Sequence, residues 1–216
     1  MKDYSQYGET KLIAEIVKLL ERSDFVVPRV AVEFGAGDGY HLSNIRGLME
    51  AGWTGFQYDW EPKGLAVVLR NITVDNVNQV VPMACGVLSI DVDGNDYWLW
   101  RALLWAPCIV VIEFNPTLSG NKTIFYDPYH RWAGDDYFGA SFGALVGLGT
   151  HKGYGLLYRT PCNLIFVRAD LHPPPETVEV YEPIAEGWKL SGRAFQSLFL
   201  KPDPKIIEGW KNEKEN

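Results

Sequence analysis

The stretch AVEFGAGDGYHLSNI, residues 31–45, predicts a strand, a tight turn and a helix in direct succession. The run Arg29–Phe34 is short, apolar and rich in β-branched residues, and it stops at Gly35, which is typical of a buried strand that enters a turn. Over His41–Ala51 the apolar residues return with helical spacing. A strand, a glycine-rich turn and a helix form the first half of a parallel crossover unit.

The same alternation continues along the chain and predicts an α/β fold with a mostly parallel sheet. The expected strands are nearly all apolar, which is typical of a parallel sheet covered by helices on both faces. A short turn joins the last two and predicts a C-terminal antiparallel hairpin. The predicted strands are Arg29–Phe34, Thr54–Tyr58, one within residues 65–77, Gly86–Ile90, Cys108–Ile112, Tyr154–Arg159 and Asn163–Arg168. The predicted helices are Glu9–Arg22, His41–Ala51, a short one within residues 75–81, Tyr97–Trp105 and Ser141–Leu148.

The chain has the length of one α/β domain with additions, and a change of character marks the boundary. We expect the domain to span residues 1–170. The proline-rich sequence LHPPPE then predicts a stiff spacer. Residues 171–216 form a C-terminal extension with an amphipathic piece at Phe195–Leu200, and we expect it to pack on the domain or on a partner.

Composition and charge narrow the choice of partners and compartment. The net charge of −7 disfavours nucleic acid as a partner, because a broad phosphate-binding face needs a basic surface. No run of about 18 apolar residues predicts a membrane span, and the N-terminus lacks the basic and apolar regions of a signal peptide. The 3 cysteines form no CxxC pair, so we expect neither a disulfide framework nor a structural zinc site. These features predict a cytoplasmic protein.

Acidic residues follow several of the predicted strands at the point where each strand ends. They are Glu33 with Asp38, Asp59 with Glu61, the turn of residues 91–96, and Glu113. In an open parallel sheet the ligand lies outside the carboxyl ends of the strands. We therefore expect these acids to surround one ligand site, because acids without such a role would be scattered over helix faces.

The glycine-rich turn suits a cofactor with hydroxyl and amine groups better than a phosphate. Gly35, Gly37 and Gly39 let the backbone turn sharply and approach a ligand. The dinucleotide fingerprint would require glycine where Tyr40 stands, and no Walker lysine follows. Glu33, before the glycines, would repel a phosphate but attract an amine, and an acid after the second strand suits a ribose. S-adenosylmethionine combines both features.

Five segments of the sequence together resemble the FkbM-type branch of S-adenosylmethionine-dependent methyltransferases. They are most similar to its bacterial and phage-associated members with a SIDxDGNDY motif, and the resemblance covers residues 4–168. It implies a Rossmann-like class I methyltransferase fold, here compressed between the second and fourth strands, at Glu61–Leu88. The segments are YSQYGE (4–9), VEFGAGDGYHLSN (32–44), LSIDVDGNDYWLW (88–100), VVIEFNPT (110–117) and GASFGALVGLGTHKGYGLLYRTPCNLIFV (139–167).

The resemblance implies transfer of a methyl group from S-adenosylmethionine to a hydroxyl of a small molecule, such as a sugar. The residues around the glycine-rich turn would shape the methionine side of the cofactor pocket. Either Asp59 or Glu61 would bind the ribose diol, since an ionised carboxylate accepts two hydrogen bonds well. Asp91 would face the sulfonium and the acceptor. The residues expected at the cofactor are Glu33, Gly35, Ala36, Gly37, Asp38, Ser43, Asn44, Asp59, Glu61 and Asp91.

Methyl transfer from a sulfonium is an in-line displacement, so alignment of the acceptor with the methyl group supplies most of the acceleration. An alcohol acceptor also needs a base or a metal ion for its alkoxide. Carboxylates are hard oxygen ligands, and we expect Asp91, Asp93 and Glu113 to hold Mg²⁺ or Mn²⁺. The alternative is an Asx-rich turn that satisfies its own backbone groups, with Asn95 or Asp96 capping the following helix. The candidate catalytic residues are Asp91, Asp93, Asp96, His41 and His130.

Aromatic residues are more numerous than a core of this size needs, and several lie in a long loop at residues 115–137. The segment FYDPYHRW, residues 125–132, predicts either a lid over the acceptor or a contact in a homo-oligomer.

Two functions besides methyl transfer stay open. One is a cofactor-binding or degenerate module that acts as an interaction protein. The other is a hydrolase whose metal ion is held by the 91–96 turn and Glu113.

Overall fold

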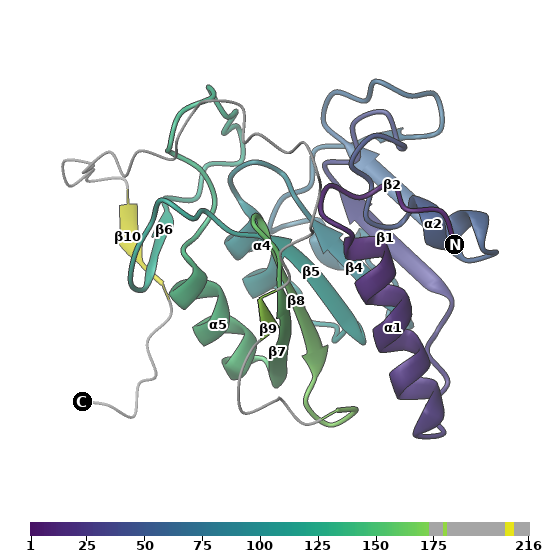
Figure 1. Cartoon of the computed structure of the whole chain (residues 1–216). Helices are drawn as coiled ribbons and strands as arrows, with labels where there is room; N and C mark the ends of the chain where they lie inside the picture. Colours follow the sequence, from purple (N-terminus) through teal and green to yellow (C-terminus); the bar gives the residue numbers. More distant parts are fainter. Residues whose placement is uncertain (173–178, 181–205, 210–216) are drawn as a thin grey trace, which may run out of the picture.

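The computed structural model of the protein describes residues 1–172, 179–180 and 206–209. These residues build a twisted sheet with helices on both faces (Figure 1). The helices are α1 Glu9–Arg22, α2 Arg46–Glu50, α3 Val77–Val80, α4 Asp96–Ala102 and α5 Phe142–His151. The strands are β1 Val30–Phe34, β2 Thr54–Asp59, β3 Val68–Leu69, β4 Val87–Ile90, β5 Ile109–Glu113, β6 Lys122–Ile124, β7 Tyr154–Arg159, β8 Asn163–Arg168, β9 Glu179–Val180 and β10 Ile206–Glu208.

The main sheet has 8 strands in the order β3-β2-β1-β4-β5-β8-β7-β9. Strand β1 runs parallel to its neighbours β2 and β4, and the pairs β2–β3 and β4–β5 are parallel as well. Strand β8 is antiparallel to both β5 and β7. The prediction of an α/β fold with a mostly parallel sheet and a C-terminal antiparallel hairpin is therefore confirmed.

The strand order reverses at β1. From β1 the chain builds β2 and β3 on one side, and it then returns to place β4 and β5 on the other side. In doubly wound sheets such a switch point opens a crevice outside the carboxyl ends of the strands. Phe34 and Ile90, the last residues of β1 and β4, are partners in register. The residues that follow them, Gly35 and Asp91, therefore lie side by side at this crevice.

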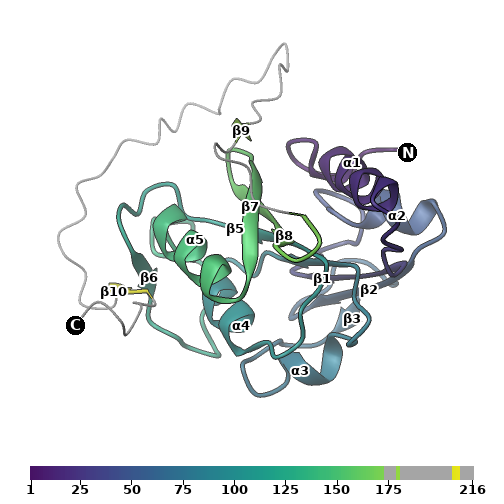
Figure 2. The same cartoon turned by 90° about the horizontal axis from the view of Figure 1, so that it is seen from below.

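Two buried apolar clusters hold the helices against the sheet. Successive residues of a strand point to opposite faces. Ala31 of β1 accordingly packs with residues of α1 and α2, and Val32 packs with residues of α3, α4 and α5. Figure 2 shows α1 and α2 on one side of the sheet and α3 and α4 on the other. Because both faces are covered, the central strands are almost wholly apolar.

The helix expected at His41–Ala51 is shorter than predicted, since α2 begins at Arg46. Leu42 has a φ of 62°, a left-handed conformation that a right-handed helix excludes. Ser43 and Asn44 instead donate hydrogen bonds to the buried carboxylate of Glu33. A tertiary hydrogen-bond network has thus overridden the helical periodicity of this segment.

Other boundaries also differ from the expectation. The helix predicted at Tyr97–Trp105 spans Asp96–Ala102, because Leu103 is extended. Between β2 and β4 the chain forms a strand of 2 residues and a helix of 4 residues. The long loop before α5 contains β6, which pairs with β10 in a separate two-stranded sheet.

The C-terminal extension contacts the domain at two places within the described residues. Strand β9 pairs with β7 at the edge of the main sheet, and β10 pairs with β6. The amphipathic piece expected at Phe195–Leu200 lies outside the described residues. In the part of the chain that the structure describes, no helix combines the length and apolar character needed to cross a membrane.

Candidate functional site

A cavity of about 540 Å³ lies outside the carboxyl ends of β1, β2, β4 and β5. The loop after β1, the residues after β2 and β4, and the last residue of β5 border it. Every residue expected at the cofactor lines this cavity, including Ala36, Ser43 and Asn44. The fold thus brings the strand-end acids to one place. The titratable residues of the lining are Glu33, Asp38, His41, Asp59, Glu61, Lys63, Asp91, Asp93 and Glu113.

The glycine-rich turn packs closely against the end of β4. Gly35 has a φ of 76°, and a Cβ atom built on it would lie 1.6 Å from the carbonyl oxygen of Asp91. Glycine is therefore required at this position both by the backbone conformation and by the available space. Gly37, with a φ of 54°, turns its amide toward the end of β2 and donates a hydrogen bond of 2.8 Å to Asp59 Oδ2.

Glu33 is buried beneath the cavity and binds to donors of the protein itself. Its carboxylate accepts hydrogen bonds from Ser43 Oγ (2.6 Å), Asn44 N (2.7 Å) and Gln57 Nε2 (2.9 Å). Burial raises the pKa of Glu33, and these hydrogen bonds oppose the increase. Because both oxygens are engaged, Glu33 fixes the loop after β1 and forms part of the cavity floor.

Asp38 and His41 lie at the rim of the cavity. The carboxylate of Asp38 accepts hydrogen bonds from the backbone amides of Tyr40 (2.8 Å) and His41 (2.7 Å), which lower its pKa. Asp38 thereby stabilises the turn that follows the glycines. The side chain of His41 is exposed at the cavity, where a ligand can reach it.

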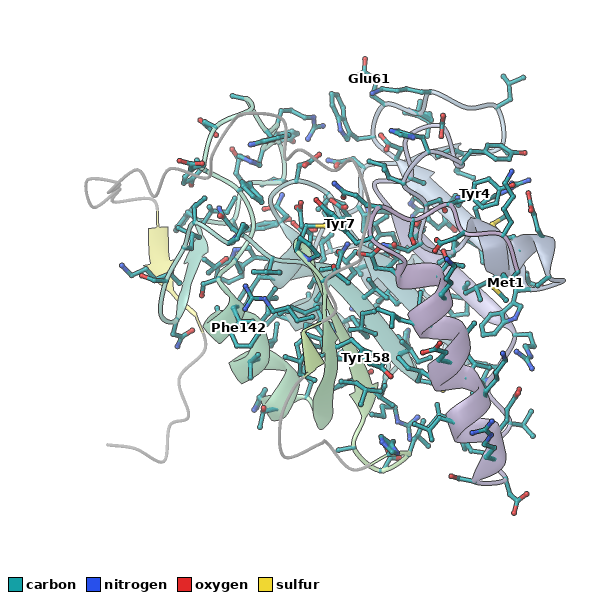
Figure 3. The ribbon with its side chains drawn as sticks, viewed as in Figure 1. Met1, Tyr4, Tyr7, Glu61, Phe142 and Tyr158 are labelled. Atoms are coloured by element: carbon teal, nitrogen blue, oxygen red, sulfur yellow. The ribbon has the colours of Figure 1, made fainter. Side chains whose placement is uncertain are left out.

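The two acids expected at the ribose differ in their surroundings. Asp59 ends β2 and is half-buried, and its carboxylate accepts hydrogen bonds from Gly37 N (2.8 Å) and Glu61 N (2.7 Å). Glu61 is exposed, and Figure 3 shows its side chain at the edge of the molecule, pointing outward. Asp59 is therefore held in a fixed orientation by the glycine-rich turn, whereas Glu61 is not.

Asp91, Asp93 and Glu113, the residues predicted as metal ligands, form one carboxylate cluster. One carboxylate oxygen from each lies within 4.8 Å of the other two. Burial, followed by repulsion from the neighbouring acids, raises the pKa of Asp91 and Glu113 well above their ordinary values. Asp93 is more exposed, and partial desolvation, followed by repulsion from Asp96 and Asp59, raises its pKa to about 6. Among the described residues, no lysine, arginine or histidine forms an ion pair with the cluster.

The carboxylate cluster fits a divalent cation. It offers three hard oxygen ligands, which are the donors that Mg²⁺ and Mn²⁺ prefer. Oε2 of Glu113 is buried and has no hydrogen-bond partner in the described structure. A cation would offset the negative charge of the three carboxylates, whose pKa values are raised by burial and by neighbouring acids. Asp91, Asp93 and Glu113 are therefore the residues that would hold such an ion.

Asp96, a predicted catalytic residue, lies outside the cavity lining. It is fully buried at the start of α4 and accepts hydrogen bonds from Val92 N (2.8 Å) and Gly94 N (2.9 Å). These bonds close the turn that carries Asp91 and Asp93. The expectation that Asn95 or Asp96 caps α4 is wrong, because no side chain accepts a capping hydrogen bond there.

His130, the other candidate base, also lies away from the main cavity. Its ring packs against Gly94, where an added Cβ atom would lie 2.2 Å from His130 Cδ2. Its Nε2 atom is buried without a hydrogen-bond partner in the described structure. His130 therefore contacts the back of the 91–96 turn, and His41 is the candidate histidine that reaches the cavity.

Sequence reasoning missed several residues of the cavity wall. Gln6 reaches it because the N-terminal segment is tied to the β7–β8 turn. The buried Glu9 accepts hydrogen bonds from Tyr7 N (2.8 Å) and from Thr160 Oγ1 (2.8 Å), and Figure 3 shows Tyr7 near the centre of the molecule. The segments YSQYGE and FYDPYHRW stand out in the sequence, but the sequence did not predict which of their side chains line the cavity. The other missed residues are Phe34, Leu42, Trp60, Lys63, Ser89, Trp132 and Phe138.

The site and fold together define an α/β protein with a cavity at the switch point of a doubly wound sheet. A comparison of the sequence with models of protein families finds no match, and a comparison with curated proteins finds none either.

Proposed function

We propose that this protein is an S-adenosylmethionine-dependent methyltransferase of the FkbM-type branch, with a Rossmann-like class I fold, and that it methylates a hydroxyl of a small molecule. The observation that carries this proposal is the position of Asp59. Its carboxylate is fixed by Gly37 beside a cavity at the switch point of the sheet, where the second strand ends. Doubly wound folds bind nucleosides at this crevice, with an acid on the ribose hydroxyls.

The cavity suits the cofactor in size and charge. Its volume of about 540 Å³ lies within the range of about 300–1,000 Å³ that small-molecule sites occupy. Seven acids line it against one lysine, so a positively charged sulfonium is favoured over a phosphate. A carboxylate has about four lone-pair sites. Asp59 uses its oxygens for two backbone amides and keeps capacity for the ribose diol.

The protein's own groups account for the remaining chemistry. The bound cofactor would supply the methyl group, and alignment of the acceptor in the cavity provides most of the rate enhancement. Asp91 and Glu113 line the cavity at the ends of β4 and β5, and a carboxylate in its ionised form can accept the proton of a hydroxyl group. A divalent cation held by the carboxylate cluster would favour the alkoxide form of the acceptor.

A hydroxylated acceptor such as a sugar suits the aromatic and acidic residues of the cavity lining. Trp132 and Phe138 line the cavity together with the carboxylate cluster. Aromatic rings offer a flat apolar surface to the ring of a sugar, and carboxylates accept hydrogen bonds from its hydroxyl groups. This arrangement supports the expected role of the long loop as a lid over the acceptor.

The carboxylate cluster favours a second candidate function, a metal-dependent hydrolase. A thermal-shift panel with S-adenosylmethionine, S-adenosylhomocysteine, Mg²⁺ and Mn²⁺ separates the two, because a ligand that binds the folded state alone raises its stability. A methyltransferase is expected to be stabilised by both adenosyl compounds. Stabilisation by the cations alone, with no response to either adenosyl compound at millimolar concentration, would overturn our proposal and favour the hydrolase.

A further inference from the structure

A second, much smaller cavity of about 20 Å³ lies beside the main one. The two share Gly35, Asp59 and Trp60 in their linings. Asp59 therefore lies between them, with the main cavity on one side and the small cavity on the other. If Asp59 binds the ribose, as we propose above, the base of the nucleoside extends into the small cavity.

The planar wall of the small cavity is covered by an arginine of the protein. Arg131 lies over the ring of Trp60, with 3.8 Å between its guanidinium carbon and the ring centroid. Trp60 is 46% exposed, so this contact is made at the surface. A guanidinium group stacks on the same face of an aromatic ring that a nucleobase uses. Arg131 thus covers one face of Trp60, on which a base could otherwise stack.

The same loop also engages the side-chain amide of Asn95, which lines the small cavity and is 8% exposed. Asn95 Nδ2 donates to the carbonyl oxygen of Asp127 at 2.7 Å, and Asn95 Oδ1 accepts from the amide of Asp127 at 3.3 Å. Adenine offers an equivalent pair, a donor at N6 and an acceptor at N7, which an asparagine amide binds in the same two-point manner.

We propose that residues 127–131 occupy the adenine subsite of the free protein, and that the base replaces Arg131 on Trp60 and the peptide of Asp127 on Asn95. This inference rests on the proposed function. It explains why the small cavity has little free volume although it adjoins Asp59. It also gives the long loop of residues 115–137 a role at the cofactor in addition to its role at the acceptor, because residues 127–131 have to move before the nucleoside can bind.

Binding of S-adenosylhomocysteine to the full chain, measured by isothermal titration calorimetry, tests this exchange. The Arg131→Ala variant lacks the competing stack, and we expect it to bind about two- to five-fold more tightly, in line with the strength of an exposed cation–π contact. The Trp60→Ala variant loses the stacking surface, and we expect it to bind at least about five-fold more weakly. The inosine analogue of the ligand, which lacks the N6 donor, is expected to bind at least about five-fold more weakly to the unmodified protein.

Arg101→Ala is the matched control. The guanidinium of Arg101 lies over the ring of Trp98, 5.3 Å from its centroid, and neither residue lines the two cavities. This variant removes the same charge and the same kind of contact, and we expect it to bind like the unmodified protein.

The outcomes separate the inference from the function on which it rests. If the unmodified protein binds the ligand and Arg131→Ala binds no more tightly, the exchange is overturned while the methyltransferase proposal stands. Equal binding of the adenosine and inosine compounds overturns the pairing with Asn95. If neither the unmodified protein nor Arg131→Ala binds an adenosyl compound, the proposed function fails and the subsite fails with it.

Discussion

The backbone amide of Gly37 donates a 2.8 Å hydrogen bond to the carboxylate of Asp59 and so joins the loop after β1 to the end of β2. These two residues are 22 positions apart in sequence, yet the parallel pairing of β1 with β2 brings them together. The hydrogen bond orients the Asp59 carboxylate without help from a ligand. A ligand that uses Asp59 therefore finds the carboxylate already in place.

Asp59→Ala tests this arrangement. The change removes the carboxylate from the cavity, and we expect the affinity for S-adenosylhomocysteine, measured by calorimetry, to fall at least about ten-fold, since a charged hydrogen bond contributes about 1.5–3 kcal/mol. Glu61→Ala is the matched control, because Glu61 is exposed and points outward. A larger loss in Glu61→Ala than in Asp59→Ala would reverse our assignment of the ribose ligand.

Gly35→Ala tests the close contact between the glycine-rich turn and β4. The new Cβ atom would collide with the carbonyl oxygen of Asp91 in addition to straining a backbone with a φ of 76°. We expect the free energy of unfolding, measured by urea denaturation, to fall by more than about 2 kcal/mol. Gly52→Ala provides the comparison, because its φ is 92° but nothing lies within 4 Å of its added Cβ atom. Equal losses in the two variants would contradict a steric role for Gly35.

Asp93→Asn tests the cost of keeping Asp93, a member of the carboxylate cluster, charged beside Asp96 and Asp59. The pKa of Asp93 is about 6 in the folded protein, against an ordinary value of 3.8 that applies to the unfolded chain. Between these values the folded state binds more protons, so the free energy of unfolding decreases as the pH rises from about 4 to about 6. We expect Asp93→Asn to weaken this decrease and to be more stable than the unmodified protein at pH 7, as measured by urea denaturation at several pH values. Asp75→Asn, at an exposed residue before α3, should show the same dependence of unfolding free energy on pH as the unmodified protein. If all three proteins showed the same dependence, the prediction would be contradicted.

Divalent cations provide a separate test of the same cluster. At neutral pH we expect Mn²⁺ or Mg²⁺ to raise the unfolding temperature of the unmodified protein, because the cation binds the three carboxylates of the folded state. Glu113→Gln should reduce this effect strongly, and Asp75→Asn should retain it. An equal response of both variants, seen by calorimetric melting, would show that the cation binds elsewhere.

The sequence predicted best those features that follow from the parallel sheet. Asp91 and Asp93 follow β4, and Glu113 ends β5. Parallel strands end at one edge of the sheet, so the meeting of these residues was predictable. The bounds of β7 and β8 were also predicted, because both strands are apolar and a short turn separates them.

Features that depend on tertiary contacts were not predictable. The start of α2 is set by the bonds of Ser43 and Asn44 to Glu33, which no local periodicity reveals. Asp96 accepts hydrogen bonds from the preceding turn, although an acid directly before the predicted helix Tyr97–Trp105 is typical of a cap. The contact of Arg131 with Trp60 joins a loop to a strand end about 70 residues away, and neither residue type signals the other.

The hydrogen bonds of Glu33 hold the floor of the main cavity in place, while the loop of residues 127–131 covers the small cavity beside it, with Arg131 in contact with the exposed ring of Trp60. This division has a kinetic consequence. If nucleosides bind as we propose, their association is limited by how often the loop opens, and we expect the association rate constants of related compounds to converge on a common value below the diffusion limit. Differences in affinity between such compounds are then expressed in how long each one stays bound.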